Sequence, residues 1–212
     1  MSTPTPTPFG LRERKKQRTG RQIAETARRL FAERGFEHVT VAEIARAAEV
    51  SEGTVFNYFP SKEDLVYERM ELFEQELLSA IRDRPAGESL VAAFRRFILT
   101  PRGFLASADP SAAEQLRAIT QTIAQSPALL AREQQIIDRY TGALASMIAH
   151  ESRRADDDIE PWVIANALLG VHRALLDYVR RELVAGTPTR RIAAGVKRRG
   201  ERALALLEKG LD

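Results

Sequence analysis

The chain has 212 residues, 44% of them hydrophobic, so it can bury a sizeable core in one large domain or in a small domain joined to a larger one. It contains no cysteine, which excludes disulfide bonds, thiolate catalysis and thiolate metal sites. The net charge of +3 is uneven, because residues 1–21 hold six Lys or Arg and a single Glu, which favours an anionic partner.

Residues 1–14 are expected to form a disordered tail, because Pro and Thr dominate their first half. The segment lacks the apolar stretch of a secretory signal. No later apolar run approaches the roughly 18 residues that a membrane-spanning helix needs. We therefore expect a cytoplasmic protein without membrane contact.

The first helix is expected to begin at Thr19, where Gln22 completes a capping box, and to end at Gly35. Apolar residues recur along it at helical spacing, which predicts one buried face. These residues are Ile23, Ala27, Leu30 and Phe31.

Two short helices joined by a tight turn are predicted next. Thr40 and Glu43 form an S/T-x-x-E capping box for the first, and Ser51 can cap the second. Pro60 stops the second helix, and Ser61 can cap the one that follows. Helices this short are not stable alone, whereas two of them joined by a short turn are typical of a helix-turn-helix that reads DNA.

Residues 18–66 resemble the DNA-binding domain of the TetR family, the tetracycline-repressor-like bacterial regulators. The matching residues are Ile23, Ala27, Leu30, Phe31, Gly35, Thr40, Ile44-Ala45, Ala48, Val50-Ser51, Gly53-Thr54-Val55, Tyr58-Phe59, Ser61-Lys62 and Leu65. Phe56 departs from the pattern, since many members carry Tyr there, so Tyr58 is the better candidate for a phosphate hydrogen bond. The resemblance implies a homodimeric transcriptional regulator, a palindromic operator of double-stranded DNA, and a small-molecule effector bound in the C-terminal domain.

Two groups of DNA contacts are predicted on this basis. Phosphate contacts are expected from Arg14, Lys15, Lys16, Arg18, Thr40, Tyr58 and Lys62. Base reading is expected on the second short helix, from Glu52, Gly53, Thr54 and Asn57. There Gly53 lets the backbone approach the groove, Thr54 can meet a thymine methyl, and Asn57 can pair with adenine. The alternatives are a basic arm that is merely solvated and an Asn57 that only fills the helix surface.

The fold is predicted to be all-α. A three-helix DNA-binding domain occupies residues 15–62, and a larger helical domain for effector binding and dimerisation occupies residues 63–212. The body helices are expected from Ser61 to about Arg84, around Leu90 to Ile98, around Leu116 to Ile123, from Leu130 to Ile148, from Pro161 to Leu183, and from Ile192 to Leu207.

Effector contacts are expected from apolar and aromatic residues of these helices, with a few polar groups for orientation. The candidates are Phe94, Phe97, Phe104, Ile119, Gln121, Ile123, Tyr140, Trp162, Asn166, Leu169, His172 and Arg173. Ordinary core packing is the competing interpretation for the apolar members. For His172, a dimer interface or a neighbouring partner is favoured over a ligand.

The penultimate helix carries an apolar stripe that is wider than one neighbour needs. Its residues are Leu168, Leu169, Leu175, Leu176, Val179 and Leu183. A pairing of the last two helices across a two-fold axis would cover them, so we expect a homodimer.

No enzyme, cofactor or metal site is predicted. The acidic run Asp156-Asp157-Asp158 with Glu160 is typical of a solvated turn and helix start. The histidines at 38, 150 and 172 lack metal-ligand spacing, and the chain has no phosphate-binding glycine loop and no G-x-S-x-G elbow. The basic residues of the last helix are interpreted as a solvated face. The competing function is a DNA-binding protein that has no small-molecule effector.

Overall fold

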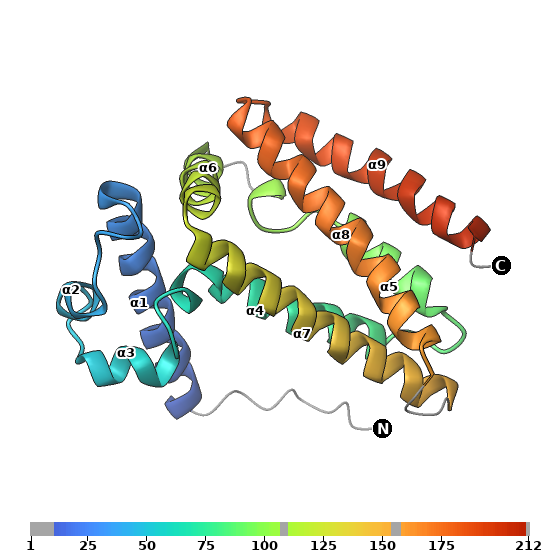
Figure 1. Ribbon diagram of the computed structural model, residues 1–212, viewed down its shortest axis with the longest axis horizontal. Coiled ribbons are helices and arrows are strands. Elements are labelled where there is room, and N and C mark those ends of the chain that lie inside the picture. Colours follow the sequence, from blue (N-terminus) through green and yellow to red (C-terminus); the bar gives the residue numbers. More distant parts are fainter. Residues whose placement is uncertain (1–10, 107–109, 154–157, 211–212) are drawn as a thin grey trace, which may run out of the picture. The chain divides into compact units, whose positions relative to one another are not determined.

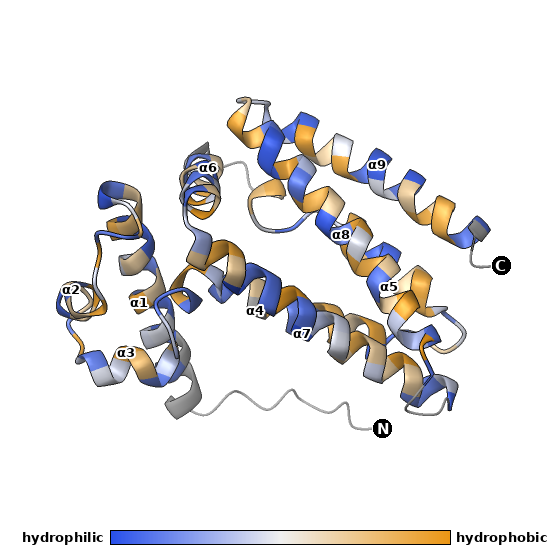
Figure 2. Cartoon of the chain, in the orientation of Figure 1, coloured by the Kyte–Doolittle hydropathy of each residue, from blue (hydrophilic) through white to orange (hydrophobic). Residues whose placement is uncertain are grey.

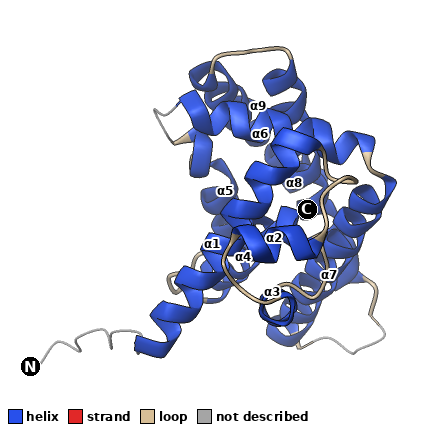
Figure 3. Cartoon of the chain, turned by 90° about the vertical axis from the view of Figure 1, so that its left-hand side faces the viewer, coloured by secondary structure: helices blue, strands red, loops and turns tan. Residues whose placement is uncertain are grey.

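The computed structural model describes residues 11–106, 110–153 and 158–210. Within these ranges the regular structure is entirely helical, as Figures 1 and 3 show, so the predicted all-α fold is confirmed. The chain divides into two compact units, residues 1–68 and residues 69–212. The boundary predicted after Lys62 falls inside the first unit, because the buried side chains of Asp64, Leu65 and Tyr67 belong to its core.

The first unit contains α1 (Leu11–Arg34), α2 (Val41–Ala47), α3 (Glu52–Tyr58) and the start of α4 (Asp64–Arg82). α1 packs against both α2 and α3. The fully buried side chains come from all four helices and from the loop before α2. They include Ile23, Ala27, Phe31, Phe36, Val39, Ile44, Val55 and Leu65.

The predicted start of the first helix at Thr19 is wrong, because α1 begins at Leu11. The residues from Leu11 to Arg18 are mostly Leu, Arg, Glu, Lys and Gln, which are good helix formers and extend the helix toward the N-terminus. Part of the predicted disordered tail, residues 11–14, is therefore helical, and residues 1–10 lie outside the described residues.

The second unit contains the rest of α4 and five further α-helices. These are α5 (Leu90–Leu99), α6 (Pro110–Gln125), α7 (Pro127–Ser152), α8 (Glu160–Val184) and α9 (Thr189–Gly210), with a short 3-10 turn at Gly103–Leu105 after α5. Proline at the first turn of α7 and of α8 fits the position where a missing N–H is tolerated. Of the predicted acidic loop, residues 154–157 lie outside the described residues.

α8 is the central helix of the second unit, since it packs against α5, α6, α7 and α9. Its neighbours bury Leu168, Leu169, Leu175, Val179 and Leu183 within a single chain and leave Leu176 half-buried. The premise that this stripe needs a second subunit to cover it is therefore wrong for all of its residues but Leu176. Figure 2 shows hydrophobic and hydrophilic residues interspersed along α9, in keeping with a helix whose other face meets solvent.

Candidate DNA-binding surface

A hydrogen-bond network fixes the start of α2. The predicted capping box is confirmed: the Glu43 amide donates to Thr40 Oγ1 at 3.2 Å, and the Thr40 amide donates to Glu43 Oε2 at 2.8 Å. Arg34, from the end of α1, donates to the other carboxylate oxygen at 2.8 Å. The backbone donor of Thr40 and then the Arg34 guanidinium lower the pKa of Glu43 to about 2. The carboxylate therefore stays charged and joins α1 to α2.

The hydroxyl of Thr40 takes part in this network, because it also donates to Glu43 at 2.9 Å. A phosphate contact from Thr40 would have to share or redirect that hydroxyl proton. The phosphate contact of Thr40 stays a prediction, whereas its role as the cap of α2 is established.

α3 begins at a second confirmed cap, in which Ser51 Oγ accepts from the Thr54 amide at 3.1 Å. Val55 faces the core, with 1% of its surface exposed, and Phe59 closes the helix from inside. The remaining positions form one outward surface, on which Glu52, Gly53, Phe56 and Asn57 are exposed and Thr54 and Tyr58 are half-buried. The four predicted base-reading residues thus lie on α3, although the Thr54 hydroxyl already shares a hydrogen bond with Ser51 at 2.8 Å.

Two residues of α1, Gln22 and Gly20, position this surface. Gln22, predicted as part of a cap, instead donates through Nε2 to the carbonyl of Ala48 at 3.1 Å, which ties α1 to the end of α2. Gly20 is buried inside α1, and a Cβ there would stand 3.2 Å from Cδ1 of Tyr58. The absence of a side chain therefore lets the Tyr58 ring lie close against α1.

The ammonium group of Lys62 already has partners within the first unit. Its Nζ donates to the carbonyls of Phe36 and Val39, at 3.0 and 3.2 Å, and lies 4.1 Å from the centre of the Phe36 ring. Lys62 thereby holds the loop between α1 and α2 against the start of α4. The predicted phosphate contact stays untested, but the geometry supports a role in positioning the helices.

We expect Lys62→Met to lower the free energy of unfolding by about 1–3 kcal/mol, because two carbonyls lose a charged donor. The salt dependence of DNA binding should stay as in the wild type. Thermal or urea unfolding and binding titrations at several salt concentrations measure both quantities. Lys16→Met is the matched control, since Lys16 is exposed on α1. It should leave stability unchanged and reduce the salt slope by about 0.9. A similar slope reduction in Lys62→Met would instead assign Lys62 to phosphate.

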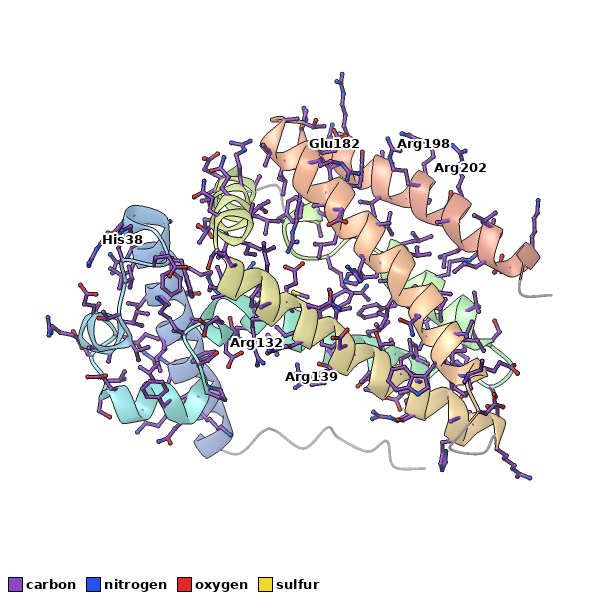
Figure 4. All side chains as sticks on the ribbon, viewed as in Figure 1. His38, Arg132, Arg139, Glu182, Arg198 and Arg202 are labelled. Atoms are coloured by element: carbon purple, nitrogen blue, oxygen red, sulfur yellow. The ribbon has the colours of Figure 1, made fainter. Side chains whose placement is uncertain are left out.

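The basic arm is part of α1. Lys15, Lys16, Arg18 and Arg21 are exposed on this helix, whereas the side chain of Arg14 lies outside the described residues. Their placement on a helix gives the positive charges fixed spacing, which suits contacts with a phosphate backbone. By contrast, Arg198 and Arg202 project away from α9 in the second unit (Figure 4), where they form part of an exposed basic face.

The structure divides the predicted effector residues into two groups. Phe94, Phe97, Ile123, Tyr140 and Leu169 are buried, and Phe104, Ile119 and His172 are half-buried. Gln121, Trp162, Asn166 and Arg173 are exposed, and Asn166 donates to the carbonyl of Trp162 at 2.8 Å within α8. The exposed polar residues therefore do not join the buried aromatic group.

Phe73 of α4, which was not among the predicted effector residues, joins two of them. Its ring stacks on His172 with centres 4.6 Å apart and meets Phe97 edge-on at 5.2 Å. Burial lowers the pKa of His172 to about 4, and the positive charge of Arg180 adds to the shift while Glu133 opposes it. The imidazole is therefore neutral near pH 7. Helical spacing indicates that Phe73 lies on the inner face of α4, but it cannot show which residues Phe73 contacts.

Polar contacts also fasten α4 to α7 within the second unit. The Tyr140 hydroxyl donates to the carbonyl of Met70, Arg139 pairs with Glu74 at 2.9 Å, and Arg84, just after α4, pairs with Glu151 at 2.6 Å. Tyr140 is thus committed to a backbone contact.

Along the described ranges, no group of three His, Cys, Asp or Glu residues is placed to hold a metal ion. No described helix is long and apolar enough to span a membrane.

Comparison with known proteins agrees with this architecture in both units. Residues 23–68 match the profile described as bacterial regulatory proteins of the tetR family, and residues 88–211 match the MftR C-terminal domain. The transcriptional regulator TcmR of Streptomyces glaucescens is 34% identical over 177 residues, covering 81% of this chain and 77% of TcmR. MftR of Mycobacterium tuberculosis is 27% identical over 169 residues, covering 80% and 83%.

A solved structure shares the fold. It is the regulator FadR of Bacillus subtilis in complex with stearoyl-CoA, with a TM-score of 0.52 and 20% identity, covering 87% of this chain and 97% of FadR. The helix-turn-helix geometry, the two matching profiles and the similarity to TcmR together show that this chain belongs to the TetR family of DNA-binding transcriptional regulators.

Proposed function

We propose that this regulator is a cytoplasmic homodimeric repressor that leaves a palindromic operator when a small-molecule effector binds to its second unit. The observation that carries the DNA-binding part is the outward surface of α3, where two confirmed caps and a buried Val55 hold Gly53 and Asn57 exposed. Exposed Lys and Arg residues of α1 supply charge for the phosphate backbone.

The homodimer is supported by the exposed face of α8. Val163, Asn166, Gly170 and Asp177 follow one another at helical spacing and are all exposed. A Cβ on Gly170 would meet nothing within 4 Å, so no contact in the described part of the chain requires glycine there. Since glycine inside a helix costs about 1 kcal/mol relative to alanine, its presence supports a close approach by a helix of a second copy. The resulting dimer would present two α3 helices to successive major grooves.

Effector release is proposed to act through α4. Residues 64–68 of this helix belong to the first unit and its later residues to the second, so a change along α4 is transmitted through one continuous helix. Phe73, Phe97 and His172 mark the aromatic group that an effector would displace or extend, and a neutral His172 can both donate and accept a hydrogen bond. FadR with bound stearoyl-CoA is an example of this fold in a ligand complex.

The coupling between effector and operator should be reciprocal. If a ligand identified by thermal-shift screening weakens operator binding, operator DNA must weaken ligand binding by the same factor, about 5- to 150-fold for a coupling of 1–3 kcal/mol. Titration of the ligand with and without operator measures this factor. Equal ligand affinities in the two titrations would contradict effector release. They would favour the second candidate, a DNA-binding protein without an effector. The complete burial of Phe94 also fits that candidate.

A further inference from the structure

We propose that the basic face of α9 is a second site for double-stranded DNA, which it binds through phosphates and without regard to sequence. This face is defined by Arg190, Arg191, Lys197, Arg198 and Arg202, all of which are exposed. It belongs to the second unit, whereas the surface of α3 belongs to the first. The inference goes beyond the proposed operator binding, because it assigns DNA to a helix that takes no part in the helix-turn-helix.

The charges of the basic face are concentrated and unmatched. Residues 190–202 hold six Lys or Arg and a single acidic residue, Glu201. Within the described ranges, no hydrogen bond or ion pair involves any of the five side chains that define the face. The second unit does pair arginine with carboxylate elsewhere, as for Arg180 and Glu133 at 2.6 Å. The basic face therefore differs from other arginines of the same unit in having its donors free.

The positions of these charges are unfavourable for α9 itself. Arg190 and Arg191 lie in its first turn, which contains no acidic residue, although the positive end of the helix dipole disfavours cations there. Arg198 and Arg202 lie four residues apart, a spacing at which like charges on a helix repel each other. No contact within the described chain offsets these two repulsions, whereas an anion bound from outside would offset both.

The packing of the second unit leaves the basic face open. Ile192, Val196 and Leu204 are buried on the other side of α9, which packs against α5 and α8. Figure 4 shows Arg198 and Arg202 projecting away from the helix. The proposed dimer uses the exposed face of α8, and a basic face set against its own copy would place like charges opposite each other. The face is therefore available in the dimer as well.

The chemistry of the face favours a phosphate backbone over a membrane or a protein. Along the roughly 18 Å from Arg190 to Arg202, a DNA duplex presents about ten phosphate charges. A helix lying in a membrane surface buries an apolar face, but Ile192, Val196 and Leu204 are buried in the unit. A protein interface is usually built on aromatic or apolar anchors, whereas the basic face consists of charged side chains. Guanidinium groups, by contrast, bind phosphate with two hydrogen bonds.

The test uses the full-length protein, whose α3 surfaces are first saturated with a short duplex selected from a random library. A labelled duplex of unrelated sequence is then titrated at several salt concentrations. The wild type should bind it as a second duplex. In the triple variant Arg190→Gln, Lys197→Gln and Arg198→Gln, the salt slope of this second binding should fall by about 2.7, since each lost phosphate contact removes about 0.9. The melting temperature and the affinity for the selected duplex should stay as in the wild type.

The triple variant Arg82→Gln, Arg153→Gln and Arg181→Gln is the matched control, because it removes three exposed charges from other parts of the second unit. It should bind the second duplex as the wild type does. A wild type that binds no second duplex overturns the inference, and so does an equal loss in the two triple variants. Binding of phosphatidylserine vesicles through the basic face, without binding of the second duplex, overturns it in favour of a lipid surface.

A wild type that selects no duplex from the library contradicts operator binding by α3 and leaves this site to be measured separately. The unrelated duplex is then titrated directly on the wild type and on both triple variants, with the same expected difference in salt slope.

Discussion

Gly170→Arg should yield a folded monomer that binds a two-half-site operator at least about 100-fold more weakly than the wild type. Gly170 is exposed on α8 and has open space above it, so arginine disturbs no contact within the described chain. The side chain would, however, stand where a partner helix is proposed to approach. A monomer binds each half-site separately. It therefore loses the high effective concentration that a dimer gives to its second DNA-binding domain once the first has bound.

Sedimentation and operator titration on the same preparation measure the two effects. Gly170→Ala is the matched control, because a single methyl group improves helix propensity and leaves most of the space open. The affinity of Gly170→Arg for a duplex with a single half-site should equal that of the wild type, because only one DNA-binding unit can bind such a duplex. A variant that remains dimeric at micromolar concentration would contradict the use of this face of α8 in dimerisation.

Asn57→Ala should weaken operator binding by roughly 5- to 150-fold and relax the preference at one base position of each half-site, as expected for a loss of 1–3 kcal/mol. Asn57 is exposed on α3 and no hydrogen bond of the described chain involves it, so its amide is available to pair with N6 and N7 on the major-groove edge of an adenine. Stability should change little, because the side chain takes no part in the core.

A competition assay against all four base pairs at each position distinguishes base reading from phosphate contact. Gln121→Ala, which removes an exposed amide of α6, should leave the base preferences unchanged. A uniform loss of affinity over all operators would assign Asn57 to the phosphate backbone. Unchanged binding would mean that Asn57 only fills the helix surface.

Local signals predicted the helix-turn-helix well, because its helices begin at caps formed by residues three positions apart. Thr40 with Glu43, and Ser51 with Thr54, are bonded as the sequence indicated. The same kind of signal misplaced the start of α1, since Thr19 and Gln22 also fit a capping box. There the helix-forming residues before Thr19 extend the helix to Leu11, and Gln22 donates to the carbonyl of Ala48 instead of capping. A local pattern cannot reveal a partner that only folding brings close.

The remaining differences also concern contacts between distant parts of the chain. The role of Lys62 depends on carbonyls 26 and 23 residues earlier, which the sequence gives no means to locate. The apolar period of α8 correctly indicated burial of Leu168 and Leu183. It could not show how many helices of the same chain would cover them. Helical spacing indicates an inner face for Phe73, but its stacking on His172 depends on the packing of α4 and α8.

The most direct test of DNA binding by α3 is the ratio of affinities for the selected operator and for a scrambled duplex of the same length at one salt concentration. We predict a ratio of at least about 1,000 for the wild type, typical of specific regulators, and a marked fall in that ratio for Asn57→Ala. Equal affinity of the wild type for the two duplexes would contradict sequence-specific reading by this surface.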